Sequence, residues 1–188
     1  MAKLSKQNPF KIHVAQSILY GNYKPFRPIV DVIKKLIPEH LDRIAKQFDL
    51  PAKVNINIRP IKGNVRGRAV FETSSVEVDP RYSFKDFIST LVHECVHIEQ
   101  HFQGRLKWFN TVKYWKGEEV KMGSTFDAYW NLPWEVEARD KSDLYLSSVR
   151  IGNVFYRHLP KDVKDAHKSV DKSDEGVVKR LNRKVTKS

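Results

Sequence analysis

The sequence predicts an α+β domain, in which a small mixed or antiparallel sheet packs on a central helix and on a second helix further along the chain. Three observations predict it. Residues 54–58 alternate apolar and polar side chains as a half-buried strand does, and residues 84–103 repeat apolar side chains every three or four positions as an amphipathic helix does. Residues 133–140 begin with a proline and acidic side chains, which is typical of a helix start. With 188 residues and 40% hydrophobic side chains, the chain can bury a core of this kind.

By composition the chain divides into three parts: an N-terminal arm at 1–27, a domain at 28–160 and a basic tail at 161–188. The arm has no clear periodicity and contains prolines, so we expect it either to pack on the domain or to stay mobile. The tail is highly charged and has no aromatic residue. We therefore expect it to be flexible, apart from a short helix near 176–181.

The first part of the domain is expected to supply helical structure and three strands. Apolar side chains recur helically over 28–48 and Pro38 interrupts them, which predicts a kinked helix or a helix pair that covers a sheet. A loop with two glycines follows the strand at 54–58. It leads to 69–71 and 76–78, which are expected to form a hairpin or a strand pair.

The central helix is expected to run from about Phe84 to Gln103. Ser83 can cap its first turn, with Asp86 three residues further on, and Gly104 stops it. The stripe that faces the core consists of Phe84, Phe87, Ile88, Leu91, Cys95, Ile98 and Phe102.

His93, Glu94 and His97 form an HExxH motif on this helix. Positions four apart lie about 40° from each other around a helix, so both imidazoles can converge on one cation. Glu94 lies beside them and can take a proton from a water whose pKa zinc lowers to about 7. The motif therefore predicts a catalytic zinc held by His93 and His97, with Glu94 as general base. The alternative is an ordinary amphipathic helix with solvated or hydrogen-bonded histidines.

A catalytic zinc normally takes three protein ligands, so the two histidines need a partner. His101 is one turn further along the same helix, and the displacement along the axis makes it a poor candidate. A carboxylate on the second helix, Glu135 or Glu137, is favoured. Residues two apart on a helix point in divergent directions, so only one of these two can bind the metal.

These residues, with the segment 131–140, resemble the gluzincins, zinc metallopeptidases of the thermolysin-like kind in which a downstream Glu completes the HExxH site. In related patterns the ligand Glu precedes a small residue by three positions. The resemblance thus implies Glu135 as ligand and Ala138 as the small residue, with Glu137 as second choice. Arg139 departs from the pattern, because several families have Asp or Asn there. The resemblance also implies a zincin-like fold, whose edge strand, placed at 71–78, binds extended peptide substrate by backbone hydrogen bonds.

The chain is also similar to small metallopeptidases of bacteriophages, over about Val54 to Leu146. The shared features are a Glu-Gln pair that follows the HExxH motif, a Trp-Lys-Gly strand and a Pro-Trp-Glu-x-Glu-Ala helix. This similarity implies peptide-bond hydrolysis in a bacterium or a phage-infected host cell.

The segment 107–130 is rich in aromatic residues. We expect them to form a hydrophobic lid and part of the core, or alternatively a wall that binds substrate. Tyr114, Tyr129 and His101 are candidates for stabilising the oxyanion, since such sites use a Tyr or His opposite the metal.

The net charge of +12 would attract polyanions, so nonspecific contact with nucleic acid is an alternative to a merely solvated basic surface. The basic charge also suggests a second hypothesis, that the protein is a SprT-like protease acting on DNA-associated proteins. That family completes its site with a third His, whereas the downstream histidines of this chain, His158 and His167, stand in contexts typical of a loop and a tail. A third hypothesis is a non-catalytic zinc-binding, nucleic-acid-associated phage protein. Structural zinc sites are usually rich in cysteine, whereas this chain has one Cys.

The sequence also bears on the compartment. No stretch approaches the length of apolar sequence that spans a membrane, and the first 20 residues lack a continuous signal-peptide core. The single cysteine excludes an intramolecular disulfide and fits a reducing compartment. We therefore expect a cytoplasmic protein without membrane contact, whose partner is a peptide or protein substrate.

Overall fold

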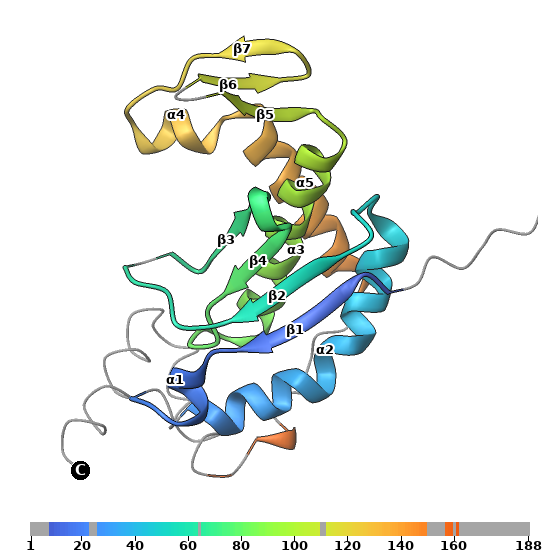
Figure 1. The fold of residues 1–188 in the computed structure, drawn as a ribbon, viewed down its shortest axis with the longest axis vertical. Coiled ribbons are helices and arrows are strands. Elements are labelled where there is room, and N and C mark those ends of the chain that lie inside the picture. Colours follow the sequence, from blue (N-terminus) through green and yellow to red (C-terminus); the bar gives the residue numbers. More distant parts are fainter. Residues whose placement is uncertain are drawn as a thin grey trace, which may run out of the picture.

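The computed structural model describes residues 8–22, 26–63, 65–109, 112–149, 157–159 and 161. Its helices are α1 (Gln16–Leu19), α2 (Arg27–Gln47), α3 (Phe84–Phe102), α4 (Phe126–Trp130) and α5 (Pro133–Ser148), with a 3₁₀ turn at Phe71–Thr73. Its strands are β1 (Phe10–Val14), β2 (Val54–Ile58), β3 (Gly67–Val70), β4 (Ser75–Val78), β5 (Leu106–Phe109), β6 (Val112–Trp115) and β7 (Glu118–Val120). The chain is thus a mixed α+β protein with small sheets, as the sequence predicts (Figure 1).

The larger sheet has the strand order β1-β2-β4-β3. β1, β2 and β4 run parallel, and β3 is antiparallel to β4. The alternation predicted for 54–58 is confirmed, because the apolar residues of β2 are buried and its two asparagines are partly exposed. The strand pair predicted for 69–71 and 76–78 is present as the ladder between β3 and β4, with Ala69 opposite Val76.

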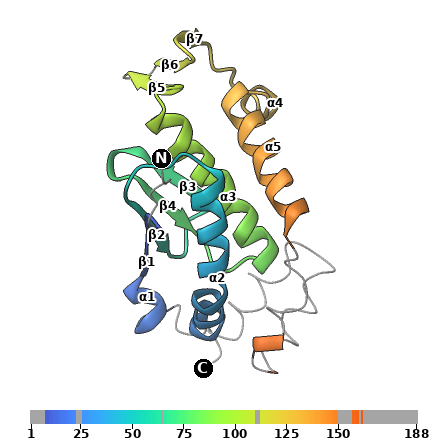
Figure 2. The ribbon, with the colours of Figure 1, turned by 90° about the vertical axis from the view of Figure 1, so that its right-hand side faces the viewer.

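α3 is the centre of the fold. The larger sheet lies on one side of it and α5 on the other (Figure 2). Ser83 caps its first turn by accepting a hydrogen bond from the backbone N–H of Asp86, as predicted. Cys95 points into the core as expected, and burial raises the pKa of its thiol. A helix enclosed in this way holds its polar side chains in fixed positions.

The smaller sheet, with the order β5-β6-β7, lies between α3 and α5 in the sequence and at the upper end of the molecule in Figure 1. A tight turn joins β6 to β7, in which Lys116 and Gly117 have φ values of 53° and 92°. Positive φ at both central residues is what a two-residue hairpin turn requires.

The aromatic segment around this sheet differs from the lid and core that the sequence predicts. Leu106, Leu132 and Trp134 form a small buried cluster beneath the sheet. An antiparallel sheet can leave one face in water, and here five aromatic side chains are largely exposed: Trp108, Phe109, Phe126, Tyr129 and Trp130. The prediction that the aromatic residues of this segment belong to the core is therefore wrong for these five.

Part of the expected N-terminal arm packs on the domain, as a strand that the sequence analysis did not predict. β1 pairs with β2 over its whole length, from Phe10 opposite Val54 to Val14 opposite Ile58. Its apolar residues alternate with polar ones, but the pattern is short, and the pairing partner stabilises such an edge strand more than its own propensity does.

α2 is one continuous helix with Pro38 inside it, which excludes a helix pair. Pro28 lies in its first turn, where a missing N–H costs little. The short helix expected near 176–181 lies outside the described residues, as does almost all of the predicted tail. Among the described helices, none has the length and apolar composition needed to cross a membrane.

Candidate metal centre

α3 and α5 bring together three side chains that could hold a metal ion: His93, His97 and Glu135. The Nε2 atoms of the two histidines are 3.1 Å apart. Oε2 of Glu135 lies 3.2 Å from Nε2 of His93 and 3.5 Å from Nε2 of His97. Ligand atoms bound tetrahedrally at zinc distances of about 2.0–2.1 Å are about 3.3 Å from one another. The three atoms therefore already have the spacing of one face of such a site.

The contact between α3 and α5 brings the carboxylate to the histidines. α5 begins at Pro133, and Glu135 follows in its first turn. Ala138, three residues further on, is fully buried. Small side chains at a helix contact let the two backbones approach closely. The three residues that the sequence analysis selected as ligands thus lie together.

Gln100 orients the imidazole of His97. Nδ1 of His97 is 2.8 Å from Oε1 of Gln100, so the ring donates its Nδ1–H to the amide oxygen. With Nδ1 bonded to Gln100, Nε2 is the nitrogen that faces the cluster: without a metal its N–H donates to Glu135, and once deprotonated it can bind a metal. The amide nitrogen of Gln100 donates to the carbonyl oxygen of Trp134 at 3.0 Å. Gln100 therefore ties the orientation of this ring to the first turn of α5.

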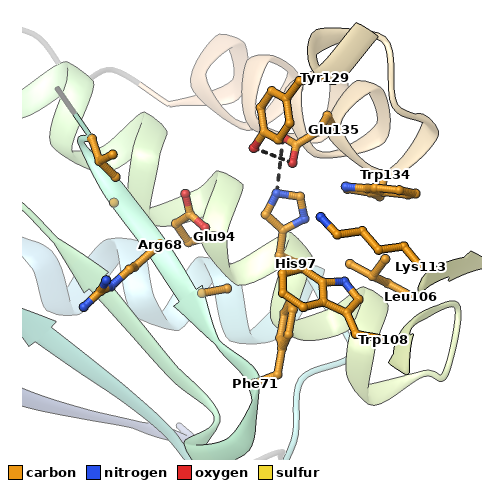
Figure 3. Close-up of a pocket in the computed structure, with 13 residues that line it drawn as sticks. Arg68, Phe71, Glu94, His97, Leu106, Trp108, Lys113, Tyr129, Trp134 and Glu135 are labelled. Carbon is orange, nitrogen blue, oxygen red and sulfur yellow. Dashed lines mark hydrogen bonds and ion pairs between the residues drawn. The ribbon is translucent and has the colours of Figure 1, made fainter. Parts of the chain in front are cut away.

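Tyr129 and the histidines keep Glu135 ionised and oriented. Burial alone would raise the pKa of this carboxyl, but hydrogen bonds from His93, His97 and Tyr129 outweigh burial and lower the pKa well below its ordinary value. The Tyr129 hydroxyl donates to Oε1 at 2.8 Å, which leaves Oε2 for the histidines (Figure 3). The cluster thus contains a carboxylate whose charge favours a cation.

Glu94 lies beside the cluster, between α3 and β3. Burial raises the pKa of its carboxyl, although the two neighbouring histidines and a hydrogen bond from the backbone N–H of Ala69 act in the opposite direction. β3 approaches α3 closely here. A Cβ atom on Gly67 would lie 2.4 Å from Cγ2 of Thr90 and 3.3 Å from Cγ of Glu94. Glycine is therefore required where the strand passes the candidate base.

A pocket of about 380 Å³ opens onto these residues. Glu94, His97 and Glu135 line one part of it, and aromatic residues of the smaller sheet and α5 line another (Figure 3). Its volume lies within the range of ordinary ligand sites. Two of the candidate metal ligands, His97 and Glu135, are therefore accessible to a small molecule or to part of a peptide.

The sheet edge beside this pocket is β3, whereas the sequence analysis placed it at 71–78. β4 is internal, because it pairs with β2 on one side and β3 on the other. The chain reverses through the 3₁₀ turn at Phe71–Thr73 and through Ser74, which has a φ of 45°. This reversal places the later strand inside the sheet and the earlier one at its edge.

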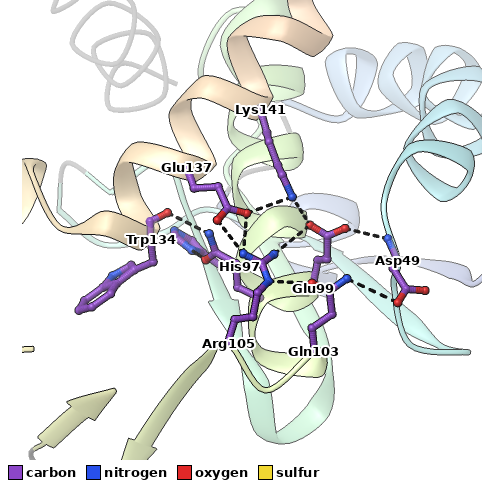
Figure 4. Close-up of polar contacts among 9 residues, drawn as sticks. Asp49, His97, Glu99, Gln103, Arg105, Trp134, Glu137 and Lys141 are labelled. Atoms are coloured by element: carbon purple, nitrogen blue, oxygen red, sulfur yellow. Dashed lines mark hydrogen bonds and ion pairs between the residues drawn. The ribbon is translucent and has the colours of Figure 1, made fainter. Parts of the chain in front are cut away.

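Glu137 is not part of the cluster, so its assignment as second-choice ligand is wrong. One nitrogen of Arg105 contacts both of its carboxylate oxygens, at 2.7 and 2.6 Å, and Lys141 lies 3.1 Å away (Figure 4). Two positions along a helix correspond to a rotation of about 200°. The rotation that brings Glu135 to the histidines therefore turns Glu137 to these cations.

The other histidines are also outside the cluster. Nδ1 of His101 lies 3.2 Å from the carbonyl oxygen of Leu106, which confirms that His101 is directed away from the two motif histidines. His158 is exposed and does not join the cluster, and His167 lies outside the described residues.

Of the three oxyanion candidates, Tyr129 lines the pocket and the other two do not. Tyr114 packs edge-on against Phe109, with ring centroids 5.9 Å apart. The ring of His101 stacks on that of Phe71, with centroids 4.6 Å apart.

The sequence analysis missed Gln100 and Lys113. Gln100 follows His97 by three positions and so faces the same side of α3, which was an available signal. Lys113 lies opposite Trp108 in the ladder of β5 and β6 and lines the pocket. Nothing in the sequence indicated this register.

Comparisons of the chain with protein-family models, with curated proteins and with solved structures gave no match.

Proposed function

We propose that this protein is a zinc-dependent metallopeptidase. The observation that supports it best is the triangle of His93, His97 and Glu135, which has the spacing of a zinc site, together with a half-buried Glu94 next to it. Two imidazoles and one carboxylate are a ligand set typical of catalytic zinc, and three protein ligands leave a position open. Structural zinc sites have four ligands, which argues against a non-catalytic role.

In this proposal His93, His97 and Glu135 hold the ion. When bound, zinc supplies Lewis-acid chemistry, which acidifies water and polarises a carbonyl group. Glu94 accepts a proton from the attacking water and delivers it to the nitrogen of the leaving amine as the C–N bond breaks. Its raised pKa makes the carboxylate a stronger base for the first of these transfers.

A SprT-like protease is less well supported. A third His would have to complete its site, whereas the described cluster is completed by Glu135. Part of the basic charge that suggested DNA is compensated locally, since Arg59 and Arg68 both pair with Glu77. Zinc metallopeptidase activity on a peptide or protein substrate remains the better proposal.

The test is to compare Glu94→Gln and His93→Ala with the wild-type chain. We expect wild-type protein to bind one equivalent of zinc and to cleave casein in a chelator-sensitive way. Glu94→Gln should keep the zinc and lose activity by about 100-fold or more, the usual range for a general base. His93→Ala should lose both zinc and activity.

Glu72→Gln is a matched control, because Glu72 is exposed and does not line the pocket. It should behave as the wild type does in metal content and in casein cleavage. An active Glu94→Gln protein, or wild-type protein that binds no zinc, would refute the proposal.

A further inference from the structure

The pocket contains a cation that no step of the proposed hydrolysis uses. Lys113 extends from β6, and Figure 3 shows its side chain between Trp108 and Trp134, with the ammonium group directed toward His97. Nζ lies 4.3 Å from the centroid of the Trp108 ring and 5.6 Å from that of Trp134. The two indoles therefore hold the side chain in the pocket by cation–π contact.

Within the described part of the chain, Lys113 has no carboxylate at ion-pair distance. Glu135 is the acidic group that acts on it, and that carboxylate is already bound by His93, His97 and Tyr129. The other cation of the wall, Arg68, pairs with Glu77 at 2.6 Å. Among the described residues, Lys113 thus differs from Arg68 in facing the pocket without a carboxylate in direct contact.

An anion in the pocket would stabilise the charge of Lys113. Burial lowers the pKa of Lys113, which reflects the cost of desolvating an ammonium group, and the charge of Glu135 offsets that cost only in part. A metal ion bound by Glu135 would remove even this offset. A carboxylate that entered the pocket would meet a partly desolvated and already positioned cation, and such charge-assisted hydrogen bonds are strong.

We propose that Lys113 is a specificity residue that binds a carboxylate of the substrate, an inference that rests on the proposed peptidase function. In a peptide this group is either the C-terminal carboxylate or the side chain of Asp or Glu. The indoles of Trp108 and Trp134 position the ammonium group and line the path to it.

The first test measures binding of two small zinc chelators by calorimetry: succinic acid monohydroxamate and its terminal amide, which has the same length and no charge. Zinc-loaded wild-type protein should prefer the carboxylate by about tenfold, the value of one charge-assisted hydrogen bond. Lys113→Met, which keeps the stem between the indoles, should lose this preference and bind the amide normally. Lys113→Arg should retain part of the preference.

Lys107→Met is the control, because Lys107 is an exposed lysine of the neighbouring strand β5 that does not line the pocket. It should keep the full preference. A wild-type protein that binds both compounds equally, or a Lys113→Met protein that still prefers the carboxylate, would overturn the inference and leave the peptidase proposal intact. Failure to bind either hydroxamate would overturn both.

The second test separates the two sources of carboxylate by kcat/KM on three matched peptides: one with a free C-terminus and Gln, one amidated with Gln and one amidated with Glu. The preferred peptide identifies the source, and Lys113→Met should cancel the advantage. If Lys113→Met instead lowers kcat equally on all three, the lysine acts on the transition state and the carboxylate role is refuted.

Discussion

Glu135 and Glu137 are the same residue type, two positions apart in the first half of α5, yet they belong to different sites. Glu135 faces two imidazoles at 3.2 and 3.5 Å and a tyrosine hydroxyl at 2.8 Å. Glu137 faces a guanidinium at 2.6 Å and an ammonium group at 3.1 Å. The partners that surround each carboxylate, supplied by α3 and the loop after it, by α4 and by α5, decide which carboxylate can bind a metal and which forms ion pairs.

The ion pairs of Glu137 in turn help to hold Glu135 in place. Arg105 follows the C-terminus of α3, and Lys141 is on α5; both also contact Glu99 of α3. Oε1 of Glu99 accepts the backbone N–H of Asp49, which follows α2 (Figure 4). The network therefore ties three segments together one turn away from the candidate metal ligands.

The largest expected difference between the two carboxylates is in metal affinity. Glu135→Ala removes one of three proposed ligands and should weaken zinc binding by more than about 100-fold, beyond the usual effect of a group that only orients a ligand. Glu137→Ala should leave the affinity within about threefold of the wild type. Competition with a zinc-binding dye measures both. The assignment fails if the two variants bind zinc equally well.

The ion pairs of Glu137 can be disrupted without changing a candidate metal ligand. Arg105→Met leaves Glu137 and Glu99 with Lys141 alone, and since these groups are only partly solvated, the free energy of unfolding should fall by about 2 kcal/mol. Urea denaturation of the metal-free protein measures the change. Lys34→Met, at an exposed site on α2, is the control and should stay within about 0.5 kcal/mol. An unchanged unfolding midpoint in Arg105→Met would show that the network does not stabilise α5.

Gln100 connects the imidazole of His97 on α3 to the first turn of α5. Gln100→Leu removes the acceptor of the His97 ring and leaves the Trp134 carbonyl without its donor. Zinc affinity should fall by about tenfold, as expected when a group that orients a ligand is lost. Gln103→Leu, at the exposed end of α3, should have no such effect. Equal zinc affinities for Gln100→Leu and the wild type would contradict the orienting role.

Among the substitutions of residues that bind zinc or contact a candidate ligand, the one at Tyr129 should have the smallest effect on zinc affinity. Tyr129→Phe keeps the ring and removes one hydrogen bond to Glu135, which is worth about 0.5–1 kcal/mol and thus about a twofold to fivefold loss of zinc affinity. The same dye competition resolves this difference. A loss as large as that of Glu135→Ala would mean that the hydroxyl itself contributes to the metal site.

The sequence predicted what depends on local geometry. Apolar spacing and the Ser83 cap were enough for α3, and helical rotation placed His93 and His97 on one face while Cys95 turned to the core. The strand at 54–58 followed from alternation in the same way. These features depend on residues that are close in the chain, so the order of side chains suffices to predict them.

What the sequence did not show depends on pairing between distant segments. β1 exists because β2 offers it a free edge, and Lys113 reaches the pocket because of the register between β5 and β6. The choice between Glu135 and Glu137 needed the position of Arg105 relative to α5. No local pattern encodes these distances.

The smaller sheet and α4 lie in the sequence between α3 and α5, the two helices that carry the candidate ligands (Figure 1). Trp108 and Lys113 belong to this inserted segment, whereas His93, His97 and Glu135 lie on the two helices, which pack on each other. Residues 106–132, which leave Arg105 in place, are therefore the segment to exchange for a different hairpin when testing which molecules the pocket accepts, provided that the graft restores a hydroxyl donor in place of Tyr129. Under the two proposals, substrate selectivity and zinc binding would thus depend on separate stretches of the sequence and could evolve independently.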